Sequence, residues 1–437
     1  MSLKDNLLNV LPIDINSKSE NDTFKEIRKQ ALDNFKKLGF PTRKEEAWKY
    51  TSLNSILREE YQLEISEPKI DIEKIKSYFL PEADTYKVIF VNGILQENLS
   101  TLVNTEGFVI DTLAKAKDTG VHKEIIAKHY NQIAKKESMV ELNTAMNFDG
   151  LFVYINKSII VDKPIELFNF AIGTNNALLL QPRNLIVAED NAQVQIIERH
   201  QNLGESSVFT NSVTEVYNSK DAQVKLYKIQ ANTETSSLVD GTYILQEGNT
   251  ESSVHTFSFG GKITRNNLEF YQHGSHSNSI LKGITILEDK EHVDHHTLVH
   301  HTQPDCESHQ DYKGIYADRS TGIFNGKIFV DKIAQKLNAY QQNNNIVVDD
   351  RATINAKPQL EIFADDVRCS HGCTIGQLPE ESLFYLRSRG IPKKEAEAVM
   401  MYAFANTALE SVSIPSLRKE IGRLIAEKLN VGIDIEI

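Results

Sequence analysis

Beyond about residue 149 the chain loses helical periodicity, and short β-rich runs replace it until about residue 366. Gly, Asn, Asp and Ser separate one run from the next, as is typical of strands joined by turns. The clearest runs are Leu151–Ile155, Leu185–Ala188, Gln193–Ile197, Thr214–Tyr217, Gln223–Tyr227, Ser253–Phe259 and Gly322–Val330. A region of this length built from such short strands predicts a mainly β core, either a solenoid or a sandwich.

An internal repeat favours the solenoid. The segment that begins Asn191-Ala-Gln-Val returns thirty residues later as Asp221-Ala-Gln-Val. A return every 25–30 residues or so is typical of stacked coils, in which each coil covers the exposed face of its neighbour. We therefore expect a right-handed parallel β-helix. A β-sandwich is the alternative, since spacing alone does not exclude Greek-key connections, but a sandwich this long without a longer loop would be unusual.

Helical patterns flank the β region. Thr23 and Glu26 have capping-box spacing, and Gly39 ends the apolar periodicity that follows them. A second capping box, Thr42 and Glu45, predicts another helix, which carries the only tryptophan, Trp48. Further along, the sequence predicts a strand–turn–strand unit over 86–95, a helix over 122–136, and three C-terminal helices that begin near residues 379, 393 and 416. The predicted domains are 1–145 (mostly helical), 146–366 (β-helix) and 367–437 (helical).

Charge and composition exclude several functions. The formal net charge of −12 argues against a protein whose main partner is nucleic acid or an anionic membrane. Three cysteines cannot form a disulfide framework, and no apolar run is long enough to span a membrane or forms a signal peptide, so we expect a cytoplasmic protein. Both Gly-Lys pairs, at 261–262 and 326–327, are followed by Ile, so a phosphate-binding loop is missing.

Two groups of residues could bind a metal. The first is a run of six histidines within eighteen residues: His292, His295, His296, His300, His301 and His309. Alternate residues of a strand lie about 6.6 Å apart on one face, so a turn or a neighbouring coil would have to bring these imidazoles together. The run is either a metal site or a set of structural histidines, and it fits no zinc-binding spacing.

The second group is Cys369-Ser370-His371-Gly372-Cys373. Sulfur and imidazole donors suit iron, zinc or a transient iron–sulfur cluster. In an extended segment Cys369 and Cys373 would lie about 13 Å apart and could not share one ion. Any site here would therefore use one or two of these residues and ligands from elsewhere, including another subunit. The alternative is a small buried thiol beside a structural histidine.

Several longer segments resemble the SufD family, whose members are subunits of the SUF iron–sulfur cluster assembly scaffold. The resemblance is most specific over Lys357–Gly372 (KPQLEIFADDVRCSHG) and continues to Gly390. It includes Glu46–Thr51 (EAWKYT), Asn143–Gly150 (NTAMNFDG) and Gly322–Val330 (GIFNGKIFV). The related SufB family has a different, carboxylate-rich sequence where this chain has Cys-Ser-His-Gly.

This resemblance implies a right-handed β-helix between helical domains. It implies a heterodimer with a SufB-like paralogue through the β-helix, and a SufC-like ABC ATPase docked on the C-terminal helical region. The family's functional histidine corresponds to His371, with Cys369 beside it, as ligands of a nascent iron–sulfur cluster. A reduced flavin is associated with the complex. Where this chain has Cys373, the family often has alanine.

The leading hypothesis is therefore a scaffold subunit that is not itself an enzyme and holds no tightly bound cofactor when isolated. The runner-up is an independent metal-dependent β-helix enzyme that uses the histidines of 292–309. The isolated chain could also form a homodimer through a surface made for its paralogue.

Overall fold

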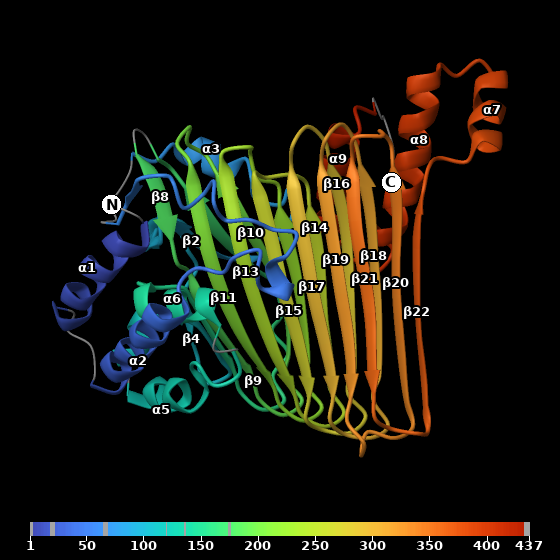
Figure 1. The fold of residues 1–437 in the computed structure, drawn as a ribbon. Coiled ribbons are helices and arrows are strands. Elements are labelled where there is room, and N and C mark those ends of the chain that lie inside the picture. Colours follow the sequence, from blue (N-terminus) through green and yellow to red (C-terminus); the bar gives the residue numbers. More distant parts are fainter. Residues whose placement is uncertain are drawn as a thin grey trace.

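A computed structural model describes residues 3–17, 22–63, 69–118, 120–134, 137–173 and 176–431. Within these ranges the chain is mainly β, with a β-solenoid of about 8 turns between helical N-terminal and C-terminal regions (Figure 1). Successive coils pair in parallel. The predicted solenoid is thereby confirmed and the sandwich is wrong, since Greek-key connections produce antiparallel neighbours.

Each coil contributes one strand to each of two sheets, so strands alternate between the sheets along the chain. In the described residues the first sheet contains β4 (Val103–Asn104), β5 (Phe108–Thr112), β6 (Leu151–Ile155), β9 (Arg183–Ala188), β11 (Val208–Asn218), β13 (Ser236–Gln246), β15 (Ile263–Gln272), β17 (His292–His301), β19 (Thr321–Val330) and β21 (Thr353–Ile362), with β1 (Tyr61–Gln62) and β8 (Ala177–Leu180) beside it. The second contains β3 (Ile94–Leu95), β2 (Tyr86–Val91), β7 (Ile165–Ala171), β10 (Gln193–Asn202), β12 (Gln223–Gln230), β14 (Glu251–Ser258), β16 (Asn278–Leu287), β18 (Glu307–Tyr316), β20 (Leu337–Val347) and β22 (Val367–Gly376).

The internal repeat sets the register between two coils. Gln193 pairs with Gln223 and Val194 with Val224, so the two copies lie side by side in β10 and β12. Asn191 and Asp221 have φ angles of 59° and 62° at the turns that precede these strands. Asn and Asp tolerate this left-handed conformation better than other residues with a side chain, which explains their recurrence at the corners.

The core lies between the two sheets, where alternate residues of each strand point inward. Stacked aliphatic side chains such as Leu226, Val254 and Leu281 form its main cluster. Each coil therefore buries its apolar face only because the next coil covers it.

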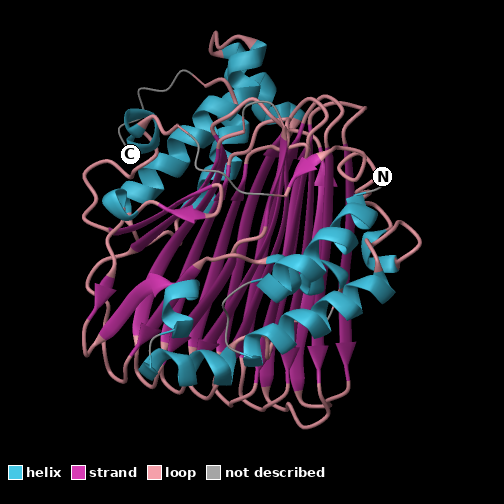
Figure 2. Cartoon of the chain, turned by 90° about the vertical axis from the view of Figure 1, so that its left-hand side faces the viewer, coloured by secondary structure: helices cyan, strands magenta, loops and turns pink. Residues whose placement is uncertain are grey.

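Helices cover the outer faces. The N-terminal helices are α1 (Leu3–Ser17), α2 (Asp22–Leu38), α3 (Ile72–Lys76), α4 (Leu113–Asp118), α5 (Gly120–His129) and α6 (Ser138–Met146), and the C-terminal ones are α7 (Glu380–Ser388), α8 (Lys393–Asn406) and α9 (Pro415–Lys428). Figure 2 shows N-terminal helices lying against the strands. Phe35 of α2 and Met139 of α6 belong to one apolar cluster with Phe209 of β11 and Val239 of β13.

Two predicted helices are shorter than expected. Thr42 and Glu45 do form part of a capping box, since the Thr42 backbone N–H donates to Glu45 Oε1 (2.8 Å), but only the short 3-10 helix Glu46–Trp48 follows. The helix predicted over 122–136 ends at His129, and residues 135–136 lie outside the described residues. It ends there because Asn131 adopts a φ angle of 60° and the backbone N–H groups of 131–134 donate to Glu215 instead of continuing the helix.

The β region extends further than predicted at its C-terminal end. Residues 367–376 form strand β22, which pairs with β20 in the solenoid, and the C-terminal helices begin only at Glu380. The predicted start of a helical domain at 367 therefore included a strand. The division into three domains stays a prediction. No helix in the described part of the chain is long and apolar enough to cross a membrane.

Candidate functional site

Strand β22 carries Cys369, His371 and Cys373, the donor residues of the second candidate group. It is the last strand of its sheet, at the right-hand edge of Figure 1. The three residues pair with Ala339, Gln341 and Asn343 of β20, all of which are buried and point into the solenoid. Because side chains two residues apart share a face, all three donors point the same way. We call this set of three the donor face.

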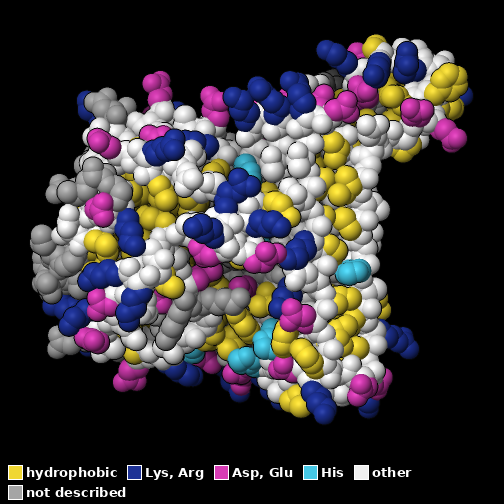
Figure 3. All heavy atoms as spheres, in the orientation of Figure 1, with side chains coloured by type: hydrophobic (Ala, Val, Ile, Leu, Met, Phe, Trp, Pro, Cys, Tyr) yellow, Lys and Arg dark blue, Asp and Glu magenta, His cyan; other side chains and the backbone are white. Residues whose placement is uncertain are grey.

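The donor face is accessible because no further coil covers it. Strands β21 and β22 end their sheets in the described chain, and we call this pair of strands the open end. Cys369 is half-buried, whereas His371 and Cys373 are exposed. Ile375, on the same face, is 53% exposed. Figure 3 shows hydrophobic side chains gathered down this side of the molecule. The inward-facing side chains of β22, which a further coil would bury, are thus exposed at the surface.

The two thiols of the donor face have different neighbours. Cys369 packs against an apolar cluster that includes Leu337 and Ala339. The thiol of Cys373 donates a weak hydrogen bond to Asn343 Oδ1 (3.8 Å). Burial raises the pKa of both thiols above its usual value, so both must lose a proton when they bind a metal.

The donor face is not a complete metal site. Neighbouring donors lie about 6.6 Å apart along the strand, and Cys369 and Cys373 about 13 Å apart. Among the described residues, no group of three or more His, Cys, Asp and Glu side chains could hold a metal ion. Nitrogen and sulfur donors suit iron, but this chain contributes only part of a ligand set, and a second chain would have to supply the rest.

The histidines of 292–309 are not brought together. His295 and His301 of β17 point into the solenoid, whereas His296 and His300 of the same strand point outward. Each has a local polar neighbour. His292 Nε2 lies 2.9 Å from Thr51 Oγ1, His295 Nε2 2.9 Å from Thr285 Oγ1 and His301 Nε2 3.0 Å from Ser308 Oγ. Carboxylates lie beside the other three, with His296 Nε2 3.0 Å from Asp294 Oδ1, His300 Nε2 3.2 Å from Asp331 Oδ2 and His309 Nε2 3.6 Å from Glu307 Oε2. This arrangement favours the structural interpretation of the run.

The open end also presents unpaired strand edges. Strands β21 and β22 are each ten residues long, and neither has a partner on its outer side among the described residues. Pro358, which cannot donate a backbone hydrogen bond, lies in the middle of β21, as is typical of edge strands. Phe363 follows β21 and is 59% exposed. A long exposed strand edge of this kind offers its free backbone groups for pairing with another strand.

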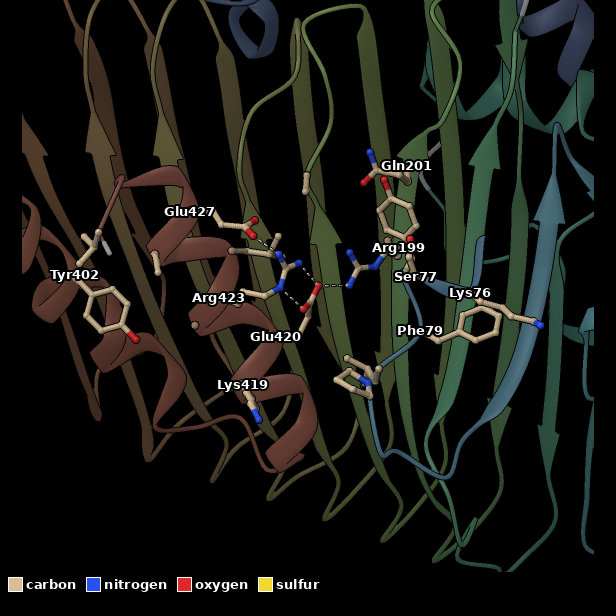
Figure 4. Close-up of a pocket in the computed structure, with 18 of the residues that line it drawn as sticks. Lys76, Ser77, Phe79, Arg199, Gln201, Tyr402, Lys419, Glu420, Arg423 and Glu427 are labelled. Carbon is tan, nitrogen blue, oxygen red and sulfur yellow. Dashed lines mark hydrogen bonds and ion pairs between the residues drawn. The ribbon is translucent and has the colours of Figure 1, made fainter. Parts of the chain in front are cut away.

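The C-terminal helices differ in how they attach to the solenoid. Helix α9 is fixed by Glu420, which lies between Arg199 of β10 (3.2 Å) and Arg423 (2.9 Å), as Figure 4 shows. These residues line a groove between α9, β10 and segment 76–81. Helix α7 instead projects beyond the last strands (Figure 1) and has no buried residue. Phe384 and Tyr385 of α7 are 73% and 58% exposed.

Sequence reasoning proposed Cys369 and His371 as site residues, which stays a prediction, and it did not predict the strand edge that presents them. The alternation that unites them with Cys373 was visible in the sequence, whereas the absence of a covering coil depends on how the strands stack. Asn343 and Asn345 lie buried within strand β20 beneath the donor face.

The fold and the donor face together define a β-solenoid protein that presents nitrogen and sulfur donors at an open sheet edge. Two models of known families match this chain. Residues 170–404 match the family model described as "SUF system FeS cluster assembly, SufBD core domain", and residues 13–167 match the "SufBD protein N-terminal region". The chain therefore belongs to the SufBD family of iron–sulfur cluster assembly proteins.

Similar proteins carry the same description. An iron–sulfur cluster assembly SufBD family protein of Synechocystis is 29% identical over 91% of this chain and 90% of its own length. The iron–sulfur cluster assembly protein SufD of Escherichia coli is 28% identical over 92% of each chain. The protein of the same name in Bacillus subtilis is 25% identical over 76% of each chain.

Proposed function

We propose that this chain is a scaffold subunit that holds part of the site where a nascent iron–sulfur cluster forms. The observation that carries this proposal is the presence of His371 and Cys369 on one accessible face of the last strand, β22. The cluster is the cargo of this site and leaves it after assembly, because the chain alone offers too few ligands to retain it.

The partner at the open end is a SufB-like paralogue. The last strands of the paralogue would extend both sheets across the subunit interface, which we call the joint. This pairing would satisfy the free backbone groups of β21 and β22 and bury Phe363 and Ile375. Pairing of this kind would also place the metal-binding side chains of this chain opposite those of the paralogue. In the isolated chain, the same edges could pair with a second copy and form a homodimer.

A SufC-like ABC ATPase docks on the C-terminal helices in this proposal. Phe384 and Tyr385 supply an exposed aromatic patch on α7, and aromatic residues are enriched at protein interfaces. Because α9 is anchored to β10 through Glu420, motion of the docked ATPase would be transmitted to the solenoid. The ATPase would also supply the nucleotide hydrolysis for which this sequence has no phosphate-binding loop.

At the joint, His371 acts as a ligand of iron in the nascent cluster and Cys369 stands beside it. We assign no residue of this chain to the reduced flavin that the family resemblance associates with the complex. The chain catalyses no reaction alone in this proposal and has no nucleic-acid or membrane partner, and we expect it in the cytoplasm. The distribution of the 292–309 histidines over both faces of the solenoid weighs against the alternative of an independent metalloenzyme.

The test is cluster assembly by the complete complex with His371→Ala. We expect the yield of assembled cluster to fall while the complex remains intact. His309→Ala, a matched change of a partly exposed histidine on the outer face of β18, should leave the yield unchanged. Normal assembly with His371→Ala would show that His371 is not a ligand.

A further inference from the structure

The donor face holds a third donor, Cys373, that the proposed function leaves unused. We infer that Cys373 and His371 form the donor pair that binds an Fe²⁺ ion during assembly, and that Cys369, which the proposed function places beside His371, serves mainly as a packing residue. This inference rests on the proposed function, because cluster assembly supplies the iron.

The spacing of the strand restricts which donors act together. His371 lies two residues from each cysteine on the same face, about 6.6 Å away between Cα atoms, so its imidazole can share an ion with either thiol only where the two side chains turn toward each other. The two thiols lie about 13 Å apart and cannot share an ion with each other. The face therefore offers two alternative pairs, Cys369–His371 and His371–Cys373, and their surroundings decide between them.

Accessibility favours Cys373. Its side chain is exposed, and its hydrogen-bond partner is the polar side chain of Asn343. Cys369 is half-buried in an apolar cluster and pairs with Ala339, which has no polar atom in its side chain. A divalent ion that binds at Cys369 would have to lose hydrating water next to an apolar surface, and this desolvation costs free energy.

A layer of buried amides lies beneath His371 and Cys373 but not beneath Cys369. Gln341, the register partner of His371, donates through Nε2 to Gln310 Oε1 (3.1 Å), which also accepts from Thr297 Oγ1 (2.7 Å). This network directs the amide nitrogen of Gln341 into the solenoid. Among the described residues its Oε1 atom is buried and has no hydrogen-bond partner, although Gln341 is only 2% exposed.

Asn345 repeats this arrangement. Its Nδ2 donates to Asn343 Oδ1 (2.7 Å), and its own Oδ1 is buried with no partner in the described chain. Buried oxygens without partners are rare in folded proteins and call for an explanation. An Fe²⁺ ion held by His371 and Cys373 would keep water ligands, and these waters would donate to Gln341 Oε1 and Asn345 Oδ1. The Cys373 thiol would release its proton to solvent on binding, with no change in oxidation state.

The test uses the full chain without oxygen, with Co²⁺ as a probe for Fe²⁺. Alkylation of each cysteine by iodoacetamide is followed by mass spectrometry with and without the metal. At a Co²⁺ concentration about ten times the dissociation constant, the free site and hence the alkylation rate of Cys373 should fall about tenfold. The rate at Cys369 should not change, and buried Cys306 reports whether the chain stays folded.

Variants make the test specific. His371→Ala should abolish the protection of Cys373, whereas His309→Ala should preserve it. The inference is overturned if Co²⁺ protects Cys369 instead, if it protects neither thiol, or if Cys373 remains protected in His371→Ala. These outcomes are separate from the proposed function, which fails only if the complete complex assembles clusters normally with His371→Ala.

Discussion

The two ends of the solenoid are finished in opposite ways. At the N-terminal end the sheets close with the two-residue strands β3 and β4, each paired antiparallel, and helices cover the first coils. At the open end, the ten-residue strands β21 and β22 stop without a partner. Short and covered edges prevent pairing with other chains, whereas long bare edges promote it. The contrast agrees with the proposed function, in which the open end pairs with another chain and the covered end stabilises this one.

The covered end should be the most sensitive to mutation. Arg183 Nη2 and Glu215 Oε2 form a fully buried ion pair (2.6 Å), and Glu215 also accepts four backbone N–H groups from residues 131–134. Arg183→Met would leave this buried carboxylate without its counter-charge, so the free energy of unfolding should fall by about 3–5 kcal/mol. Urea denaturation measures this loss.

The matched control is Lys157→Met, which breaks an exposed ion pair with Asp190 (3.1 Å). Because solvent screens such pairs, the cost should not exceed about 1 kcal/mol. Equal losses for the two variants would mean that the buried pair does not anchor the covered end.

A substitution at the open end should have little effect on the stability of the isolated chain but should weaken its pairing with a partner. Ile375→Lys places a charge on an exposed position of β22, so the free energy of unfolding should change by less than about 0.5 kcal/mol. Burying that lysine at the joint should weaken pairing with a SufB-like partner by at least about 2 kcal/mol, or roughly thirtyfold in dissociation constant. Analytical ultracentrifugation of the mixed chains measures this effect.

Ile160→Lys provides the comparison at the other end, where Ile160 is 64% exposed beside β10. Pairing should be as tight as in the unmodified chain. If Ile160→Lys weakened pairing and Ile375→Lys did not, the roles assigned to the two ends would be reversed.

A smaller effect is expected for the pH dependence of the free energy of unfolding, which involves histidines buried in the solenoid between the two ends. Burial lowers the pKa of His295 to about 4 and that of His301 to about 3, from an ordinary value of 6.5. The unfolded chain then binds more protons than the folded one below pH 6.5, so stability present above that pH is lost as the pH falls. Each histidine should lower the free energy of unfolding by about 1 kcal/mol between pH 6.5 and 5.5.

Denaturation at several pH values tests this expectation. His301→Gln, which retains a polar group near Ser308, should reduce the slope of stability against pH over that interval. A slope identical to that of the unmodified chain would show that His301 is not held neutral in the fold.

Local patterns in the sequence predicted local structure well. The repeat at Asn191 and Asp221 predicted stacked coils, and in the structure its two copies pair residue by residue, because similar turns impose similar strand starts. Asn92-Gly93 likewise predicted the hairpin of β2 and β3. These features depend only on neighbouring residues, for which turn chemistry and alternation are sufficient.

Features that depend on distant residues were missed. Helix α5 ends early because Glu215, more than eighty residues away, binds the backbone that follows it. Strand β22 was assigned to a helical domain because its inward face carries Cys369, His371 and Cys373 rather than an apolar row. The side chains of β22 need not be apolar, because no further coil of the described chain packs on them. The alternating apolar pattern that predicts a buried strand is therefore absent from β22.

The most direct test of the account is hydrogen–deuterium exchange of the full chain, alone and paired with a SufB-like subunit. If the open end forms the joint, amides of 353–362 and 367–376 should exchange markedly more slowly in the complex, while those of β4 and β5 keep their rates. Protection at the N-terminal strands without any change in β21 and β22 would contradict the central claim that the bare end of the solenoid is the assembly surface.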